Sequence, residues 1–433
     1  MQDYAMQDWE KRCEELLHFI EKSPSAFHAA ANLAAMAEEK GYMALREAED
    51  WRIVPGGRYF VTRNDSTIAA FSIPDVDIAQ IKGFHMVAAH SDSPTFKIKE
   101  NPEMPTEEQY VRLNTEKYGG MLPQTWLDRA LSVAGRIAVK QGDGVRTRLV
   151  NVDKDLLVIP NLAIHMNREA GKGQEYNAQT DLLPLYGGVK EGRPFLAHIA
   201  EAAGVDKEEM LAHDLFLYVR EKGRRFGGNG EYILSPRLDD LQCAFSAMTA
   251  MAESRPKNYI NVCAVFDNEE VGSTTRQGAD SSFLQDVLLR IKDALGQTDG
   301  WLRQRLSESF LISADNAHAV HPNHPEKADP TNRPYLNGGI VLKYHGGQKY
   351  TTDAYSGAVL KELCRKADVP VQTYFNRSDI PGGSTLGNIS ASHVSVPSVD
   401  IGLPQLAMHS AAETAGARDT EFAIRMFQVF YED

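Results

Sequence analysis

The sequence contains few cysteines, and their spacing matches no familiar zinc or disulfide motif. The four cysteines (Cys13, Cys243, Cys263 and Cys364) are far apart and form no C-x-x-C pair. We therefore expect reduced, mostly buried thiols, as in a cytoplasmic protein. Any metal ion would have to be held by histidine and carboxylate side chains.

A long apolar run and an excess of basic residues are also missing. No run of about 18 apolar residues is present, so we expect no membrane-spanning helix. Residues 1–5 do not resemble the start of a signal peptide. The 46 Lys and Arg residues face 59 Asp and Glu residues, which gives a net charge of −13. Nucleic acid and anionic membranes are therefore not expected as partners, and an acidic ligand would need a local positive group.

The length and the texture of the chain predict two domains. The 433 residues exceed one ordinary core, and the 42% hydrophobic share is typical of a soluble globular enzyme. Residues 1–99 and 234–433 alternate between predicted strands and helices, so we expect them to form one discontinuous α/β domain. Residues 100–233 consist of strand-like segments separated by glycine, proline and charged loops. We expect an inserted, β-rich assembly domain there.

The stretch at residues 259–273 has the most distinctive pattern. An apolar strand at 259–266 ends in Asp267, Asn268, Glu269 and Glu270, and a glycine and a serine follow. Adjacent buried carboxylates repel one another, so a positive group is expected beside them. One carboxylate could bind a metal ion while the other moves a proton. Taken alone, the stretch fits a solvated acidic turn equally well.

A second strand ends in a histidine. The predicted strand at 84–89 leads into His90, and Asp92 follows two residues later. His90 could bind a metal ion through one ring nitrogen, and Asp92 could orient the ring from outside. Because histidines end many strands, this pattern is weak evidence by itself.

Three further sites carry acidic or histidine side chains at the ends of elements. Asp315 ends another apolar strand, and His409 follows the last predicted strand, at residues 396–402. Asp239 and Asp240 fall in the first turn of a predicted helix. Acidic residues are common there because they interact favourably with the helix dipole, so these two have an alternative explanation.

Other polar residues are more ambiguous. Lys343 closes an apolar strand and is either a surface group or an anion-binding group in a pocket. His318, His321 and His324 lie at three-residue intervals, but neighbouring prolines predict a loop, so we expect them to be structural or outside the first ligand shell. His165 is interpreted from the sequence alone as a buried or interface histidine.

The candidates converge on one edge of the predicted sheet, because ligands of layered α/β sheets collect at the carboxyl ends of the strands. Two histidines and three or four carboxylates suit two divalent ions, with Zn²⁺ expected and Mn²⁺ or Co²⁺ as alternatives. Such a site can ionise water and polarise a carbonyl, and a spare glutamate can act as general base. The sequence therefore predicts amide hydrolysis.

Over nearly its whole length the chain resembles the aspartyl aminopeptidases, a family of two-zinc exopeptidases. A bacterial member is expected. The resemblance is carried by residues 23–28 (SPSAFH), 89–94 (AHSDSP), 126–129 (WLDR), 162–165 (LAIH), 236–240 (PRLDD), 267–273 (DNEEVGS), 313–315 (SAD), 318–323 (HAVHPN) and 405–410 (QLAMHS).

The resemblance implies a ligand set and an architecture. Asp239 would bridge two zinc ions, His90 and Asp315 would complete one, and Glu270 and His409 would complete the other. The fold would be a zinc-peptidase α/β domain interrupted by a β-rich dimerisation domain. The assembly would be a tetrahedral dodecamer built from dimers, and the substrates would be peptides with N-terminal Asp or Glu.

The resemblance also implies the remaining roles. Glu269 would be the general base, and Asp92 would support His90. Lys343 would receive the acidic side chain of the substrate's first residue, and His165 would reach the active site of a neighbouring subunit.

Two departures from the family pattern and three rival functions accompany this interpretation. Asp240 stands where the family usually has Asn, and Ser91 stands where Thr is frequent; Asp239 is assigned as the bridging residue. A two-zinc deacylase or a neutral aminopeptidase on the same scaffold is the nearest alternative. A non-catalytic assembly or cargo protein is the third, although such a protein has little need of a general base.

Overall fold

The computed structural model describes residues 8–168, 170–190, 192–383 and 385–433, which fall into two compact units. The first unit comprises the described residues up to 92 together with 223–408 and 413–433, and the second comprises 93–222 and 409–412. Apolar residues at helical spacing predict a helix at 6–22, and residues 6 and 7 of this range lie outside the described residues.

The boundaries between the units differ from those expected at 99/100 and 233/234. Strand β5 already begins at Thr95 and belongs to the sheet of the second unit. Strand β12 (Tyr232–Ser235) pairs with β20 (Glu413–Gly416) of the first unit. Both boundaries therefore lie several residues earlier in the chain than the change in composition had predicted.

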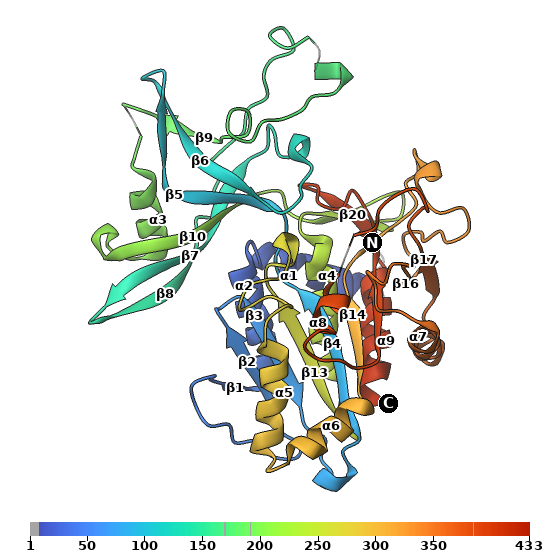
Figure 1. Cartoon of the computed structure of the whole chain (residues 1–433). Helices are drawn as coiled ribbons and strands as arrows, with labels where there is room; N and C mark the ends of the chain where they lie inside the picture. Colours follow the sequence, from blue (N-terminus) through green and yellow to red (C-terminus); the bar gives the residue numbers. More distant parts are fainter. Residues whose placement is uncertain (1–7, 169, 191, 384) are drawn as a thin grey trace, which may run out of the picture. The chain divides into compact units, whose positions relative to one another are not determined.

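The first unit is built on a mixed sheet that is nine-stranded within the described ranges (Figure 1). The central strands β13, β4, β14 and β18 are mutually parallel, whereas β16 runs antiparallel to β18. The layered α/β prediction is thus confirmed. In spatial order the strands are β1 (Met43–Leu45), β2 (Arg58–Arg63), β3 (Thr67–Ser72), β13 (Tyr259–Phe266), β4 (Gly83–His90), β14 (Phe310–Ala314), β18 (Ser398–Gly402), β16 (Ile340–Lys343) and β17 (Val371–Tyr374).

Helices cover this sheet and a smaller sheet lies in the same unit. Helix α4 packs on β4 and β13, and α9 packs on α4, while α5 and α6 lie in front of the sheet in Figure 1. The helices are α1 (Asp8–Lys22), α2 (Ala26–Glu39), α4 (Leu238–Glu253), α5 (Phe283–Ala294), α6 (Asp299–Ser307), α7 (Ala354–Ala367), α8 (Leu386–Ser390) and α9 (Asp419–Glu432). The smaller sheet contains β11 (Arg224–Phe226), β12, β20, β19 (Pro404–Leu406) and β15 (Ala317–His318).

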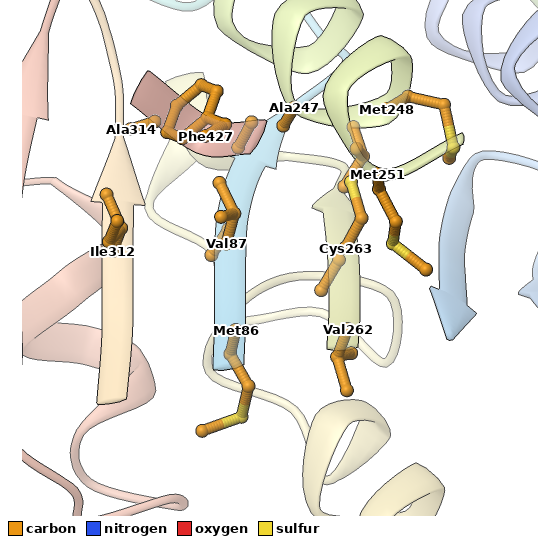
Figure 2. Close-up of a cluster of buried hydrophobic side chains, with 14 of the residues drawn as sticks. Met86, Val87, Ala247, Met248, Met251, Val262, Cys263, Ile312, Ala314 and Phe427 are labelled. Atoms are coloured by element: carbon orange, nitrogen blue, oxygen red, sulfur yellow. The ribbon is translucent and has the colours of Figure 1, made fainter. Parts of the chain in front are cut away.

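Apolar packing fixes the central strands. Val87 of β4 and Cys263 of β13 are paired neighbours in the sheet, and Met248 and Met251 of α4 lie beside them with Phe427 of α9 (Figure 2). All five side chains are almost fully buried. Burying one such large apolar side chain stabilises the fold by about 1.5–3 kcal/mol. The core therefore keeps the ends of β4 and β13 close together, even where charged side chains at those ends repel one another.

The second unit is β-rich, as expected. Its described residues form a six-stranded antiparallel sheet in the order β8 (Gly144–Asn151), β7 (Leu131–Gln141), β10 (Met210–Val219), β5 (Thr95–Thr106), β6 (Tyr110–Tyr118) and β9 (Leu185–Gly188), with one α-helix, α3 (Phe195–Ala203). Residues 156–160 have the apolar pattern of a strand, but they form isolated bridges at Leu157 and Val158. Gly135 is required where β7 meets β10, because a Cβ there would lie 2.0 Å from the carbonyl oxygen of Asp214.

The glycine-rich residues 381–387 predict a turn into a short helix, and α8 begins within them at Leu386; Ser384 lies outside the described residues. No helix in the described ranges is both long and apolar enough to cross a membrane.

Candidate metal centre

His90 is the last residue of the fully buried strand β4, and its ring is held in a defined orientation. Its Nδ1 lies 3.1 Å from the backbone oxygen of Asp92 and 3.3 Å from the Asp92 carboxylate. With the proton on Nδ1, the lone pair of Nε2 is available. Nε2 lies 3.4 Å from Asp239 Oδ1 and 3.9 Å from Asp315 Oδ1. The ring therefore presents one nitrogen to a group of carboxylates, as a metal-binding histidine does.

Asp92 ties the loop after β4 to the loop after β13. Its two carboxylate oxygens accept hydrogen bonds from the backbone N–H groups of Glu269 (3.1 Å) and Glu270 (3.2 Å). Asn268, with φ of 61°, turns the chain sharply after β13, so both N–H groups can point at Asp92. Because β4 and β13 are parallel neighbours, their ends meet at one edge, and Asp92 fixes the spacing between them.

Asp239 and Asp240 do not form the first helical turn that the sequence predicted. Both lie within α4 but have non-helical dihedral angles, and the peptide bond between them is cis. Asp239 donates its N–H to Glu413 Oε2 at 3.1 Å, and Asp240 Oδ2 accepts the N–H of His90 at 3.2 Å. Asp239 is 3% exposed and Asp240 is 0% exposed. Both are therefore buried beside His90, and the alternative explanation, that they are solvated residues interacting with the helix dipole, does not apply.

Asp315 and Lys343 meet at the same edge. Asp315 directly follows β14, and its Oδ2 lies 3.6 Å from Lys343 Nζ. Lys343 also donates to the backbone oxygen of Asn316 at 2.8 Å and is 3% exposed. Its strand β16 is antiparallel to β18, so the ammonium reaches Asp315 by the length of the side chain. The surface-group alternative for Lys343 is therefore wrong.

The pKa values of this cluster are shifted because several carboxylates are buried close together. Burial and neighbouring carboxylates raise the pKa of Glu269 to about 7, and they raise the pKa values of Asp240 and Glu270 well above normal. Burial alone would lower the pKa of His90, but Asp239, Asp315 and Asp92 raise it strongly. Likewise, the pKa of Lys343 is raised by Asp315 in spite of burial. A divalent cation at this place would offset the repulsion.

The donor atoms fit a divalent metal. His90, Asp239 and Glu270 form one group, and His90, Asp240 and Asp315 form another, each with ligand atoms within 4.8 Å of one another. Imidazole and carboxylate are common Zn²⁺ ligands. The partition differs from the implied one, because Asp240 stands beside Asp315 in the second group.

Two of the predicted site histidines belong to the second unit. His409 is half-buried, and its Nδ1 lies 2.5 Å from the backbone oxygen of Gly120. Its role as a ligand stays a prediction. His165 is exposed, between the exposed side chains of Ile164 (55%) and Met166 (74%). The buried reading of His165 is therefore wrong, and the interface reading stays a prediction.

The three histidines are exposed: His318 ends strand β15, and His321 and His324 lie in the segment that follows it. Neither metal group found among the described residues includes them. This agrees with the expectation that they are not ligands of the first shell.

Sequence reasoning missed the groups that hold the cluster together. Glu413 anchors the backbone of Asp239, and Asn316 contacts several segments around it. Both are polar residues within a few positions of a predicted ligand, and this proximity is the signal that the sequence offered. The structure shows that both are buried.

Residues 19–431 match the family described as aminopeptidase I zinc metalloproteases (M18). The chain belongs to this family. A probable M18 family aminopeptidase 2 from Clostridium novyi (strain NT) is 48% identical over 429 residues, which cover 97% of this chain and 98% of that protein. A protein of the same description from Stutzerimonas stutzeri (strain A1501) is 40% identical over 423 residues, covering 96% of this chain and 97% of its own length.

Solved structures agree with the M18 assignment. A chain in the cryo-EM structure of the Ape4 and Nbr1 complex has a TM-score of 0.95 and 37% identity, with coverage of 100% of this chain and 87% of that chain. A chain of the S. cerevisiae mApe1 dodecamer has a TM-score of 0.85 and 28% identity, with coverage of 98% and 97%. The resemblance drawn from the motifs is thus confirmed at the level of the M18 family, and the protein is a zinc-dependent aminopeptidase.

Changing Glu270 to Gln should have opposite effects with and without metal. In metal-free protein at pH 8, burial and Asp239 disfavour the ionised form of Glu270 and raise its pKa. The neutral glutamine of E270Q lacks this penalty, so the unfolding temperature should rise. Zn²⁺ affinity should fall at least about tenfold. Thermal unfolding and chelator competition measure the two effects.

The control is E362Q, which changes an exposed glutamate paired with Arg365 on α7 and should alter neither quantity. Wild-type Zn²⁺ affinity in E270Q would contradict a ligand role for Glu270.

Proposed function

We propose that this M18 aminopeptidase removes N-terminal Asp and Glu residues from peptides. The observation that carries the proposal is the buried ammonium of Lys343 beside Asp315. A cation in a dry site pairs strongly with a carboxylate. Its known contacts are the Asn316 carbonyl, the Asp315 carboxylate and the face of Tyr350, whose ring centre is 5.5 Å from Nζ. An ammonium can bond three acceptors, so a substrate carboxylate could join these contacts.

A basic cavity near Lys343 supports the same specificity. Tyr374 is the neighbour of Lys343 across β16 and β17, and it lines a cavity of about 280 Å³. His318, Lys327 and Arg377 also line this cavity, and its lining contains no Asp or Glu among the described residues. Arg377 is paired with Asp379, which is outside the lining, so Lys327 is the main source of positive charge. In a protein with net charge −13, such a surface favours an acidic peptide over a neutral one.

We propose that two zinc ions are held by His90, Asp239, Glu270, Asp315 and His409, with Asp239 shared. When bound, such ions acidify water and polarise a peptide carbonyl. The two donor groups on the first unit share His90 but differ in their carboxylates, and this difference is the basis for proposing two metal positions; the sharing of Asp239 is assigned from the family resemblance. His409, on the second unit, is assigned from the family resemblance.

Glu269 has the properties of the proton carrier in this mechanism. In the protein without metal, burial and the carboxylates of Asp315 and Asp92 raise the pKa of Glu269 to about 7. Cations bound beside Glu269 would lower this pKa and leave the side chain ionised, as a general base requires. Glu269 takes a proton from the attacking water as the new C–O bond forms. It returns that proton to the departing nitrogen as the C–N bond breaks, which yields the free amino acid and the shortened peptide. Asp92 keeps His90 and the Glu269 backbone in register throughout.

A neutral aminopeptidase or a two-zinc deacylase on the same scaffold would keep the metal centre and Glu269. Neither would need a buried lysine next to Asp315, which is why the acidic specificity is preferred. A non-catalytic scaffold protein would need neither the metal centre nor the general base Glu269.

We further propose self-association into a tetrahedral dodecamer built from dimers, in the cytoplasm of a bacterium. The S. cerevisiae relative forms a dodecamer, and four buried thiols suit a reducing compartment. The second unit, corresponding to the insertion expected at 100–233, would supply the dimer contacts. Its exposed apolar residues Leu162, Ile164 and Met166 flank His165, which would then approach a neighbouring subunit's active site.

Substituting Glu269 by Gln should abolish turnover and leave the metal in place. Glutamine preserves the shape but cannot carry the proton, so kcat should fall about 10²–10⁴-fold. Zinc content by elemental analysis should match wild type, in contrast to E270Q. Comparable kcat values for E269Q and wild type would remove Glu269 from the mechanism.

Substituting Lys343 by Met should alter selectivity. Methionine keeps most of the apolar stem and deletes the charge. The kcat/KM for peptides beginning with Asp should fall at least about 30-fold more than that for peptides beginning with Leu, because a buried charge pair is lost. K343R retains the charge and should lose less. An equal decline for both peptides would rule out Lys343 as the specificity group.

A further inference from the structure

We propose that Asn316 is a positioning residue that sets the distance between Asp239 and Asp315. Asn316 follows Asp315 directly and is 1% exposed. Its backbone is therefore continuous with one proposed metal ligand. The inference rests on the proposed ligand set and assigns a task to a residue outside it.

The side chain of Asn316 bonds to the segment that carries the other ligand. Its Nδ2 donates to the backbone oxygen of Leu238, the residue before Asp239, at 3.1 Å. The same amide nitrogen lies 2.9 Å from Gln405 Oε1 and 3.2 Å from Gln242 Oε1. Its Oδ1 accepts the Cys243 thiol at 3.3 Å. One amide thus connects the end of β14 to the start of α4 and to β19.

This connection matters because of the local backbone. Around Asp239 the chain is not helical, so regular helix hydrogen bonds do not fix the direction of its carboxylate. Asp239 and Asp315 approach Nε2 of His90 from separate segments, at 3.4 and 3.9 Å. Metal coordination tolerates only about 0.2 Å of error in ligand distances. A bond from Asn316 to the Leu238 carbonyl limits how far the two carboxylates can drift apart.

Asn316 also touches the specificity group, but through a different atom. Lys343 Nζ donates to the backbone oxygen of Asn316, which any substitution retains. Changing the side chain should therefore disturb the metal ligands more than the pocket for the substrate's acidic group. The two effects can be separated by experiment.

A matched control exists in the same sheet. Asn261 on β13 is also fully buried, and its Nδ2 donates to the backbone oxygen of Tyr431 at 2.9 Å. N261A and N316A both remove a buried amide, so both should lower the unfolding temperature. Only N316A removes a bond to the segment carrying Asp239.

The test measures Zn²⁺ affinity of the full chain by chelator competition, for wild type, N316A, N316S and N261A. We expect N316A and N316S to bind Zn²⁺ about 10–100-fold more weakly than wild type, and N261A to bind as wild type does. The ratio of kcat/KM between peptides beginning with Asp and with Leu should stay at its wild-type value in N316A saturated with zinc. N316S is the milder substitution and serves if N316A does not fold.

Affinity in N316A or N316S equal to that of N261A would overturn the proposal. Failure of the proposed specificity has a different signature, because wild type itself would then show no preference for acidic residues while the affinity comparison remained readable.

Discussion

Repulsion among buried carboxylates is the constraint on which the first unit depends. Asp92, Asp239, Asp240 and Asp315 are all buried around the single imidazole of His90. Burial raises the pKa values of Asp240 and of the neighbouring Glu270. In the absence of a metal ion, protonation and the ammonium of Lys343 relieve this repulsion, and a bound divalent cation would offset it further. The apolar core of β4, β13, β14 and their helices supplies the free energy that keeps the strand ends together.

The site is assembled from several segments and held by hydrogen bonds between them. Asp92 joins the ends of β4 and β13, Glu413 holds Asp239, and Asn316 links β14 to α4. Each bond pairs a buried polar group that would be costly if left alone. The same bonds that satisfy these groups therefore fix the geometry that a metal ion requires.

The sequence predicted the parts that follow from local patterns. His90, Glu269, Glu270 and Asp315 stand at ends of apolar strands, and parallel pairing brings those ends to one edge. The irregular backbone at Asp239 was not predictable, because a helical pattern begins there and tertiary contacts override it. The direction of β16 and the unit boundaries also depend on long-range pairing, which periodicity does not encode.

The proposed activity of this centre is the metal-dependent removal of acidic N-terminal residues from peptides. The most direct measurement is release of the first residue from matched peptides beginning with Asp, Glu, Leu or Ala, by protein stripped of metal and then given Zn²⁺, Mn²⁺ or Co²⁺. Metal-dependent cleavage confined to Asp and Glu is the predicted result. Metal-dependent cleavage of Leu or Ala instead would contradict the specificity, and cleavage without any metal would contradict the metal centre.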